Sequence, residues 1–259
     1  MLDAITPVIL TLNEEPNIER TLAALAWARD IVVVDSGSDD ATVEIARRHA
    51  NVRTFTRPFD SHAAQWNFAI GETRIASDWI LALDADYVLT PALVEELRAL
   101  IPPGDVDGYR TRFEYCVNGK PLRASVYPPV LTLFRRGRGA YEQDGHTQRL
   151  RLAGAERRLA SPIRHDDRKP LARWLASQSR YMKLEARKLA AAPSAALNFA
   201  DRLRKAIVIA PGAVLVYLLL VRGLVLDGRA GLYYALQRAT AELLLSLHLL
   251  QERLGPGEP

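Results

Sequence analysis

The chain has 259 residues, of which 49% are hydrophobic and 25% are charged, so it can bury a substantial core. Its formal net charge is +4, and the excess lies in residues 171–259, which contain 12 Lys and Arg against 6 Asp and Glu. Residues 1–170 contain 22 Lys and Arg against 24 Asp and Glu, so this part of the chain is slightly acidic. This distribution argues against a generally basic nucleic-acid binder. The single Cys116 forms no internal disulfide and fits a reducing compartment. The N-terminus has neither a basic leader nor a long apolar stretch, so we expect no signal peptide.

Two hydrophobic periodicities alternate along the first hundred residues. Short apolar or β-branched runs predict strands at residues 5–10, 31–34, 52–55 and 79–83. Helical spacing predicts helices at residues 18–26 and 62–75. A further helix is predicted to begin near residue 43, with Ser38 or Asp39 as its N-cap. Such repeated units indicate an α/β fold, in which a mostly parallel sheet has helices on both faces. Ligands of these sheets bind beyond the carboxyl ends of the strands.

Polar residues follow three of the predicted strands at that edge. They are Thr11 to Glu14, Asp35 to Asp40, and the pair Asp84 and Asp86. Hard divalent cations prefer carboxylate oxygens, so the aspartate pair predicts a Mg²⁺ or Mn²⁺ site, although a solvated turn is the alternative. Asp35 is suited to accept hydrogen bonds from a base or ribose, and Gly37 lets the backbone approach a ligand closely. Neither a dinucleotide fingerprint nor a P-loop is present.

Four sequence motifs together resemble those of glycosyltransferase family 2. They are Leu-Asn-Glu-Glu at 12–15, Val-Val-Asp-Ser-Gly-Ser-Asp-Asp at 33–40, Gln-Trp-Asn-Phe-Ala at 65–69, and Leu-Ala-Leu-Asp-Ala-Asp at 81–86. The set is similar to the branch of lipopolysaccharide-core glucosyltransferases. The resemblance covers residues 4–100 well and residues 101–170 more loosely.

The resemblance implies a GT-A fold that binds a nucleotide sugar, with a UDP-sugar as the expected donor. The residues that match the family's nucleotide-sugar positions are Thr11, Leu12, Asn13, Glu14, Asp35, Gly37, Gln65, Asn67 and Asp84. The resemblance also implies a Mg²⁺ or Mn²⁺ ion at Asp86 and Asp84, with His165 approaching the metal or the diphosphate. A bound cation would stabilise the charge that develops on the leaving phosphate. A structural role is the alternative for His165.

The catalytic base is the point at which the sequence departs from the resemblance. An inverting transfer needs a base that deprotonates the acceptor hydroxyl. Relatives carry a His-Glu pair in the second half of the domain, whereas Thr147 follows His146 here. Asp144 is therefore the first candidate, Glu142 the second and His146 the third, although Asp144-Gly145 also fits a simple turn. Tyr87 is a second departure, since many relatives have an acid there.

The sequence pattern of the second half of the chain indicates two further boundaries, near residue 104 and near residue 170. The Pro-Pro-Gly-Asp sequence at 102–105 separates a nucleotide half, 1–104, from an acceptor half, 105–170, with strands expected at 109–115 and 130–134. Residues 171–259 predict a helical region. Residues 206–221 have no charged side chain, but the run is short for a bilayer span and Pro211-Gly212 interrupts it. Leucines from 232 to 250 then recur at helical spacing, which favours an amphipathic helix on an anionic membrane surface. A helical subdomain packed on the catalytic core, or a dimer interface, is the alternative.

The leading hypothesis is an inverting, metal-dependent glycosyltransferase. It would act on a lipid-linked or cell-envelope glycan, in the cytoplasm and peripherally associated with the inner face of the cell membrane. A sugar-phosphate nucleotidyltransferase is the first alternative, but its Gly-rich N-terminal loop with a basic residue is missing at residues 12–15. A catalytically degenerate nucleotide-sugar-binding protein is the second, because Thr147 cannot act as a base. Turnover of a nucleotide sugar would separate the last hypothesis from the first.

Overall fold

The computed structural model describes residues 1–144, 147–193, 195 and 197–255, and the chain forms two compact units. We call the first the α/β unit; it comprises Met1–Pro121 and Val126–Arg168. The second, the helical unit, comprises Leu122–Ser125 and Lys169–Pro259. The short segment Leu122–Ser125 thus interrupts the α/β unit in the sequence and groups with the helices.

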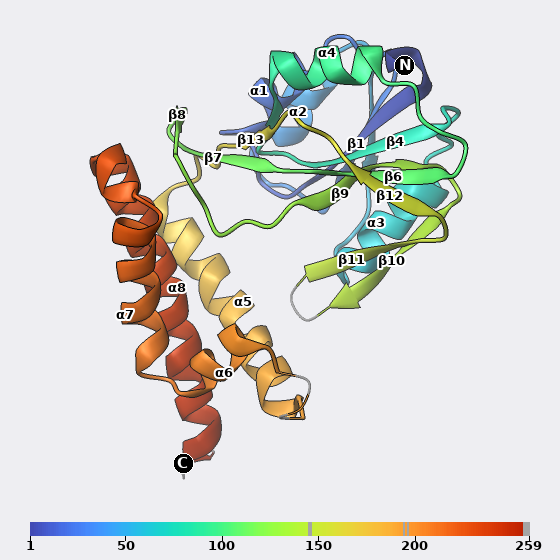
Figure 1. Ribbon diagram of the computed structural model, residues 1–259. Coiled ribbons are helices and arrows are strands. Elements are labelled where there is room, and N and C mark those ends of the chain that lie inside the picture. The colour runs from blue at the N-terminus through green and yellow to red at the C-terminus, as the bar shows by residue number, and fades with distance from the viewer. Residues whose placement is uncertain (145–146, 194, 196, 256–259) are drawn as a thin grey trace. The chain divides into compact units, whose positions relative to one another are not determined.

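A seven-stranded sheet forms the centre of the α/β unit, in the order β12-β6-β9-β4-β1-β2-β3 (Figure 1). Strand β1 is parallel to β2 and β4, and β2 is parallel to β3, whereas β9 is antiparallel to β4 and β6. The mostly parallel sheet that the sequence predicts is therefore confirmed. The bounds of the strands are β1 Ile5–Thr11, β2 Ile31–Asp35, β3 Val52–Thr56, β4 Trp79–Asp84, β6 Val106–Thr111, β9 Val130–Arg135 and β12 Ala155–Arg158.

Helices cover both faces of this sheet because alternate strand residues point to opposite sides. Val33 belongs to the core shared with α1 (Ile18–Ala23), α2 (Thr42–Arg47) and α4 (Pro91–Ala99). Its neighbours Val32 and Val34 belong to a second core with Trp66 of α3, His62–Gly71. Figure 1 shows α1, α2 and α4 together and α3 on the other side of the sheet. A continuous apolar strand, buried on both faces, is what this arrangement requires.

A smaller sheet lies beside the main one and has the order β5-β13-β7-β8. The strand predicted at 109–115 is two strands, because β6 ends in the main sheet and β7 begins in the smaller one. Strand β13 is antiparallel to β5 and parallel to β7. The bounds are β5 Tyr87–Leu89, β7 Phe113–Val117, β8 Lys120–Pro121 and β13 Ile163–His165.

Three helix predictions need correction. Helix α1 ends at Ala23 and not at residue 26. Helix α3 ends at Gly71 and not at residue 75, and Arg74 has a positive φ of 56°, which is incompatible with a continuing helix. Helix α2 has Ala41 at its N-cap without a side-chain cap, so neither Ser38 nor Asp39 caps it. The Ser38 hydroxyl donates to Asp35 instead.

A β-hairpin of β10 (Gly139–Asp144) and β11 (Thr147–Leu152) packs against α3. The ring of Tyr141 stacks on Trp66 at a centroid distance of 5.2 Å. The side-chain amide of Asn67 donates to the Tyr141 carbonyl and accepts from its backbone N–H, both at 2.9 Å. These contacts fix the first strand of the hairpin on α3.

The helical unit has a core of its own, in which α5 and α7 pack on α8. Its buried apolar residues include Met182, Ala186, Leu189, Ala241, Leu245 and Leu249. Pro211 lies in the first turn of α7, where proline is tolerated, so it does not interrupt the helix as the sequence suggested. The bounds are α5 Leu171–Ala191, α6 Phe199–Lys205, α7 Ile209–Val216, η3 Tyr217–Val221, η4 Leu224–Asp227 and α8 Arg229–Leu254, and a short turn, η1 Leu2–Ala4, precedes β1. Among the residues that the structure describes, no helix is both long and apolar enough to cross a membrane.

Candidate functional site

The carboxyl ends of β1, β2 and β4 meet at one edge of the main sheet. The register pairs Thr11 with Asp35 and Leu10 with Asp84. Residues from three predicted polar clusters are thus placed at the same edge. This edge is where parallel sheets bind ligands.

Asp35 organises the loop that follows β2. Its buried carboxylate accepts four hydrogen bonds, from the Thr11 hydroxyl, the Gly37 and Ser38 backbone N–H groups and the Ser38 hydroxyl, at 2.5–2.9 Å. Gly37 has a φ of +94°, which a residue with a side chain rarely adopts. Asp35 therefore holds the loop in shape, a role beyond the nucleoside contact that the sequence predicts.

The loop after β1 is joined to the loop after β2. Asn13 has a positive φ of 57°; its N–H donates to the Ser38 hydroxyl at 2.7 Å, and its side-chain oxygen accepts from the Asp39 N–H at 2.8 Å. The Glu14 N–H donates to the Thr42 hydroxyl at 2.7 Å. Leu12 is 42% exposed, so its side chain contributes open surface at this edge. The two loops form one cross-linked rim.

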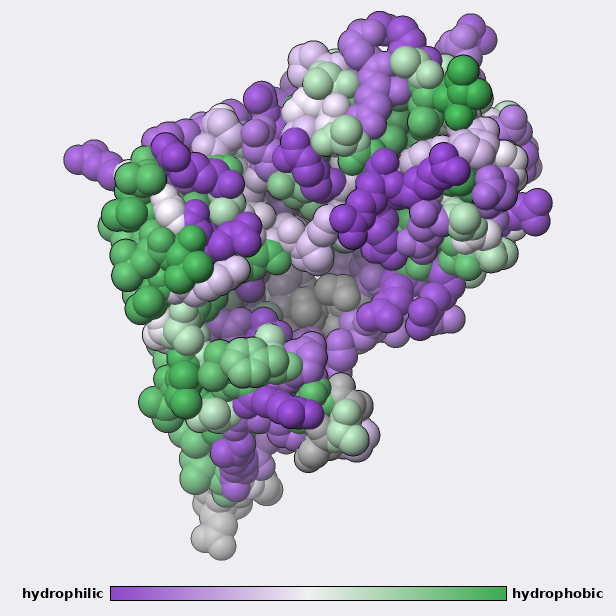
Figure 2. Space-filling model, viewed as in Figure 1, coloured by the Kyte–Doolittle hydropathy of each residue, from purple (hydrophilic) through white to green (hydrophobic). Residues whose placement is uncertain are grey.

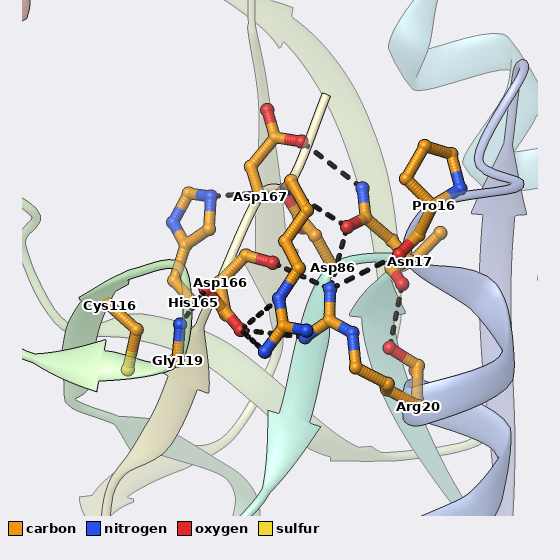
Figure 3. Close-up of polar contacts among 12 residues, drawn as sticks. Pro16, Asn17, Arg20, Asp86, Cys116, Gly119, His165, Asp166 and Asp167 are labelled. Atoms are coloured by element: carbon orange, nitrogen blue, oxygen red, sulfur yellow. Dashed lines mark hydrogen bonds and ion pairs between the residues drawn. The ribbon is translucent and has the colours of Figure 1, made fainter. Parts of the chain in front are cut away.

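A buried pair lies beyond the end of β4. Asp86 and His165 are 8% and 7% exposed, and Asp86 Oδ2 lies 3.1 Å from His165 Nε2 (Figure 3). The Asp166 N–H donates to the Asp86 carbonyl at 3.1 Å, which ties the end of β13 to this turn. Asp84 is the exposed last residue of β4. The structure thus brings Asp86 and His165 together, although 79 residues separate them in the sequence.

Aromatic rings surround the His165 side chain. Tyr87, Phe113, Tyr115 and Tyr127 have ring centroids 4.7–6.2 Å from the imidazole. Burial lowers the pKa of His165, but the carboxylates of Asp86, Asp84 and Asp167 together raise it, and the net shift is upward. Burial raises the pKa of Tyr87, and Asp84 and Asp86 raise it further. Tyr87 is therefore a neutral phenol packed against the imidazole.

An arginine–aspartate network supports this pair and was missed in the sequence. The Asp166 carboxylate accepts from Arg20 at 2.7 Å, from Arg168 at 2.8 Å and from the Gly119 N–H at 2.9 Å (Figure 3). The second Arg20 nitrogen donates to Asn17 Oδ1 at 2.7 Å. The network fixes α1 against the segment that follows β13. The sequence offered only a weak signal for it, the acids that follow His165.

Replacing Arg20 by Met is expected to lower the free energy of unfolding by about 2 kcal/mol, because Asp166 stays buried with fewer charged donors. Urea unfolding followed by circular dichroism measures this change. The matched control is Arg29→Met, which breaks an ion pair with Asp3 whose partners are 75% and 71% exposed. We expect about 0.5 kcal/mol or less for the control. Equal losses in the two variants would show that the network contributes no more than a surface pair.

The amides predicted to bind the nucleotide sugar in α3 are engaged in internal contacts. Gln65 is fully buried; its amide donates to the Ser36 hydroxyl and the Arg57 carbonyl, both at 3.1 Å, and accepts from Arg57 at 2.6 Å. Asn67 holds the hairpin through Tyr141, as described above. Both side chains therefore position neighbouring segments of the edge.

The candidate bases lie on the β10–β11 hairpin. Asp144 forms an ion pair with Arg149, and Glu142 forms one with Arg151, each at 2.9 Å. The side chain of Asp144 is 30% exposed and that of Glu142 is 62% exposed. His146 lies outside the described residues. Burial raises the pKa of Tyr141, in the middle of β10, and the Asp84 carboxylate raises it further.

The donors at this edge fit a divalent cation. Asp86 and His165 offer a carboxylate oxygen and an imidazole nitrogen side by side, and buried His165 Nδ1 has no hydrogen-bond partner among the described residues. In the part of the chain that the structure describes, no cluster of three or more His, Cys, Asp or Glu side chains is arranged to hold a metal ion. Mg²⁺ is commonly held by one or two carboxylates and completed by substrate phosphates and water, so two or three protein donors are sufficient.

Comparisons with known proteins agree with this geometry. The chain is 31% identical over 141 residues to the lipopolysaccharide core biosynthesis glycosyltransferase LpsC of Rhizobium meliloti, a match that covers 52% of each chain. It is 35% identical over 106 residues to an uncharacterized glycosyltransferase of Rickettsia bellii, covering 40% of this chain and 35% of that one. The chain therefore spans about half the length, or less, of these curated relatives.

A solved structure shows the same architecture. The S. aureus TarS 1-349 fragment in complex with UDP-GlcNAc has a TM-score of 0.52 at 14% identity, over 96% of this chain and 91% of that one. This likeness shows a GT-A-like α/β fold. Residues 6–150, more than half of the chain, match the family model described as Glycosyl transferase family 2, with LpsC as a relative from lipopolysaccharide synthesis, and the chain therefore belongs to glycosyltransferase family 2.

Proposed function

We propose that the protein is an inverting, metal-dependent glycosyltransferase that moves a sugar from a UDP-sugar to a lipid-linked or cell-envelope glycan at the cytoplasmic face of a membrane. One observation carries the proposal. The cross-linked rim formed by Thr11, Asn13 and Asp35 lies at the same sheet edge as Asp84 and the Asp86–His165 pair. One edge thus offers a rigid polar loop for a nucleoside and acidic donors for a diphosphate-bound cation.

The donor side of the proposal rests on the rim. TarS, which shares the fold, is described as a complex with UDP-GlcNAc and as one with UDP. The exposed apolar side chain of Leu12 at the rim suits contact with a planar base. The relation to LpsC, a lipopolysaccharide core enzyme, supports an envelope glycan as the acceptor.

Replacing Asp35 by Ala is expected to weaken UDP binding at least about tenfold, even with EDTA present, because the loop loses the acceptor of four hydrogen bonds. Isothermal titration calorimetry measures the affinity. The matched control is Asp30→Ala at the opposite end of β2, where the carboxylate pairs with Arg53. Unchanged affinity in Asp35→Ala, with the fold intact, would place the nucleoside elsewhere.

The cation would be held by Asp86, Asp84 and His165, and when bound it neutralises charge on the diphosphate. The protein residues around it have separate tasks. Arg20 and Asp166 hold the His165 segment in position, and the aromatic rings around the imidazole exclude water from it. Asp144 is proposed to accept the proton of the acceptor hydroxyl.

Turnover tests the proposed reaction. The purified protein is incubated with UDP-glucose, UDP-galactose or UDP-GlcNAc and with extracted envelope glycolipid, with and without Mn²⁺, and UDP release is measured. We expect release that depends on both the glycolipid and Mn²⁺, and a product of inverted anomeric configuration by NMR. No release with any donor would contradict the proposed function, and a retained configuration would contradict the inverting mechanism.

A further inference from the structure

The helical unit exposes many large apolar side chains, and contiguous exposed apolar surface marks interaction sites. Helix α8 has a leucine stripe along its whole length, with each side chain at least 41% exposed: Leu232, Leu236, Leu243, Leu247, Leu250 and Leu254. The opposite side of the helix, with Ala241, Leu245 and Leu249, is buried in the core of the unit. The stripe is thus a second apolar face on a helix whose packing is already satisfied.

The elements that precede α8, namely α7, η3 and η4, pack on it and also expose apolar side chains. From the end of α7 to η4, five apolar side chains are 55–72% exposed: Val216, Leu220, Val221, Val225 and Leu226. Figure 2 shows hydrophobic surface, in green, gathered over α7 and the turns that follow it. We call the α8 stripe and these five residues the apolar helical face.

The exposed charges around most of the apolar helical face have one sign. Residues 202–251 contain only two carboxylates, Asp227 and Glu242, and both are buried. Asp227 pairs with Arg123 at 3.0 Å, and Glu242 pairs with Arg204 at 2.8 Å. The exposed charged side chains of this stretch are Arg202, Arg222 and Arg229. At the end of α8, beside Leu254, one acid and one base are exposed, Glu252 and Arg253. Apart from that end of α8, the face is therefore apolar with a basic border.

From these observations we propose that the apolar helical face is a docking surface for an anionic lipid bilayer. Its leucines would enter the boundary between headgroups and acyl chains, and Arg222 and Arg229 would contact the phosphates. A second copy of the chain fits less well, because a two-fold interface would bring the same basic residues of both copies together. The inference deepens the membrane location in the proposed function and rests on it, but it does not depend on the transfer reaction.

Vesicle flotation with the full chain tests this surface. Vesicles of phosphatidylcholine alone are compared with vesicles that also contain phosphatidylglycerol. We expect binding to the anionic vesicles, reduced about five-fold for each basic residue removed from the border. Leu243→Glu/Leu247→Glu and Arg222→Glu/Arg229→Glu are expected to abolish binding. The matched controls are Leu184→Glu and Lys183→Glu/Arg187→Glu on α5, which change exposed residues outside the face and should bind as the wild type does.

Three outcomes would overturn the inference. The wild type does not float with either vesicle; the face variants float as well as the α5 controls; or the wild type is a dimer that Leu243→Glu/Leu247→Glu converts to a folded monomer without a change in lipid binding. Circular dichroism confirms that each variant is folded. UDP release is also measured on the same proteins without vesicles, with Mn²⁺ and detergent-solubilised envelope glycolipid as the acceptor, so that loss of docking is distinguished from failure of the proposed reaction.

Discussion

Replacing Asp86 by Asn is expected to lower sugar transfer by about 10³-fold while the protein stays folded. A cation on the diphosphate contributes several kcal/mol of charge stabilisation, and on the order of 4 kcal/mol corresponds to this loss. Asparagine has the shape of aspartate and can still hydrogen-bond His165, so the buried contact at 3.1 Å is preserved while the charge is lost. Initial rates at saturating donor, with Mn²⁺ varied, measure the effect.

Binding measurements separate this effect from a damaged nucleotide site. Asp86→Asn should lose the part of UDP affinity that depends on Mn²⁺ and keep the affinity measured in EDTA, whereas Asp35→Ala should lose affinity in both. Asp105→Asn, at an exposed carboxylate that precedes β6, controls for the loss of a charge and should transfer normally. Mn²⁺-stimulated transfer by Asp86→Asn at a near wild-type rate would exclude Asp86 from the metal site.

The sheet edge could be predicted because local sequence determines it. An apolar, β-branched run such as 31–34 forms a buried strand when helices cover both faces of the sheet. The residue after the last valine, Asp35, then lies at the edge of the sheet. The same holds for Asp84 at the end of β4. The periodicity therefore placed Thr11, Asp35 and Asp84 together before any contact was known.

Contacts distant in sequence could not be predicted in this way. Arg20 and Asp166 are 146 residues apart, and nothing near either residue indicates the other. The prediction of a single strand at 109–115 was wrong for a related reason. Its hydrophobic pattern does not show where the chain passes from one sheet to the next. Gln65 and Asn67 illustrate a further limit. An amide that binds a ligand and one that binds a backbone use the same donors and acceptors, so only the structure reveals their internal partners.

Asp144→Asn is expected to lower the transfer rate by about 10²- to 10⁴-fold, the usual contribution of general acid–base catalysis, and to leave UDP binding nearly unchanged. The hairpin position supports this expectation. Asp144 lies at the turn end of β10, and its side chain is the more sheltered of the two hairpin carboxylates. Single-turnover rates at saturating donor and acceptor isolate the chemical step from binding.

Glu142→Gln is the matched control, because Glu142 lies two residues away on the same strand and also pairs with an arginine of β11. Both ion pairs are at least partly exposed, so neither variant should lose more than about 1 kcal/mol of stability. A base at Asp144 predicts a large loss of rate in Asp144→Asn and a near-normal rate in Glu142→Gln. The reverse result would move the role to Glu142. Normal transfer by both variants would place the base outside these two carboxylates, and His146 would then be the remaining candidate of the loop.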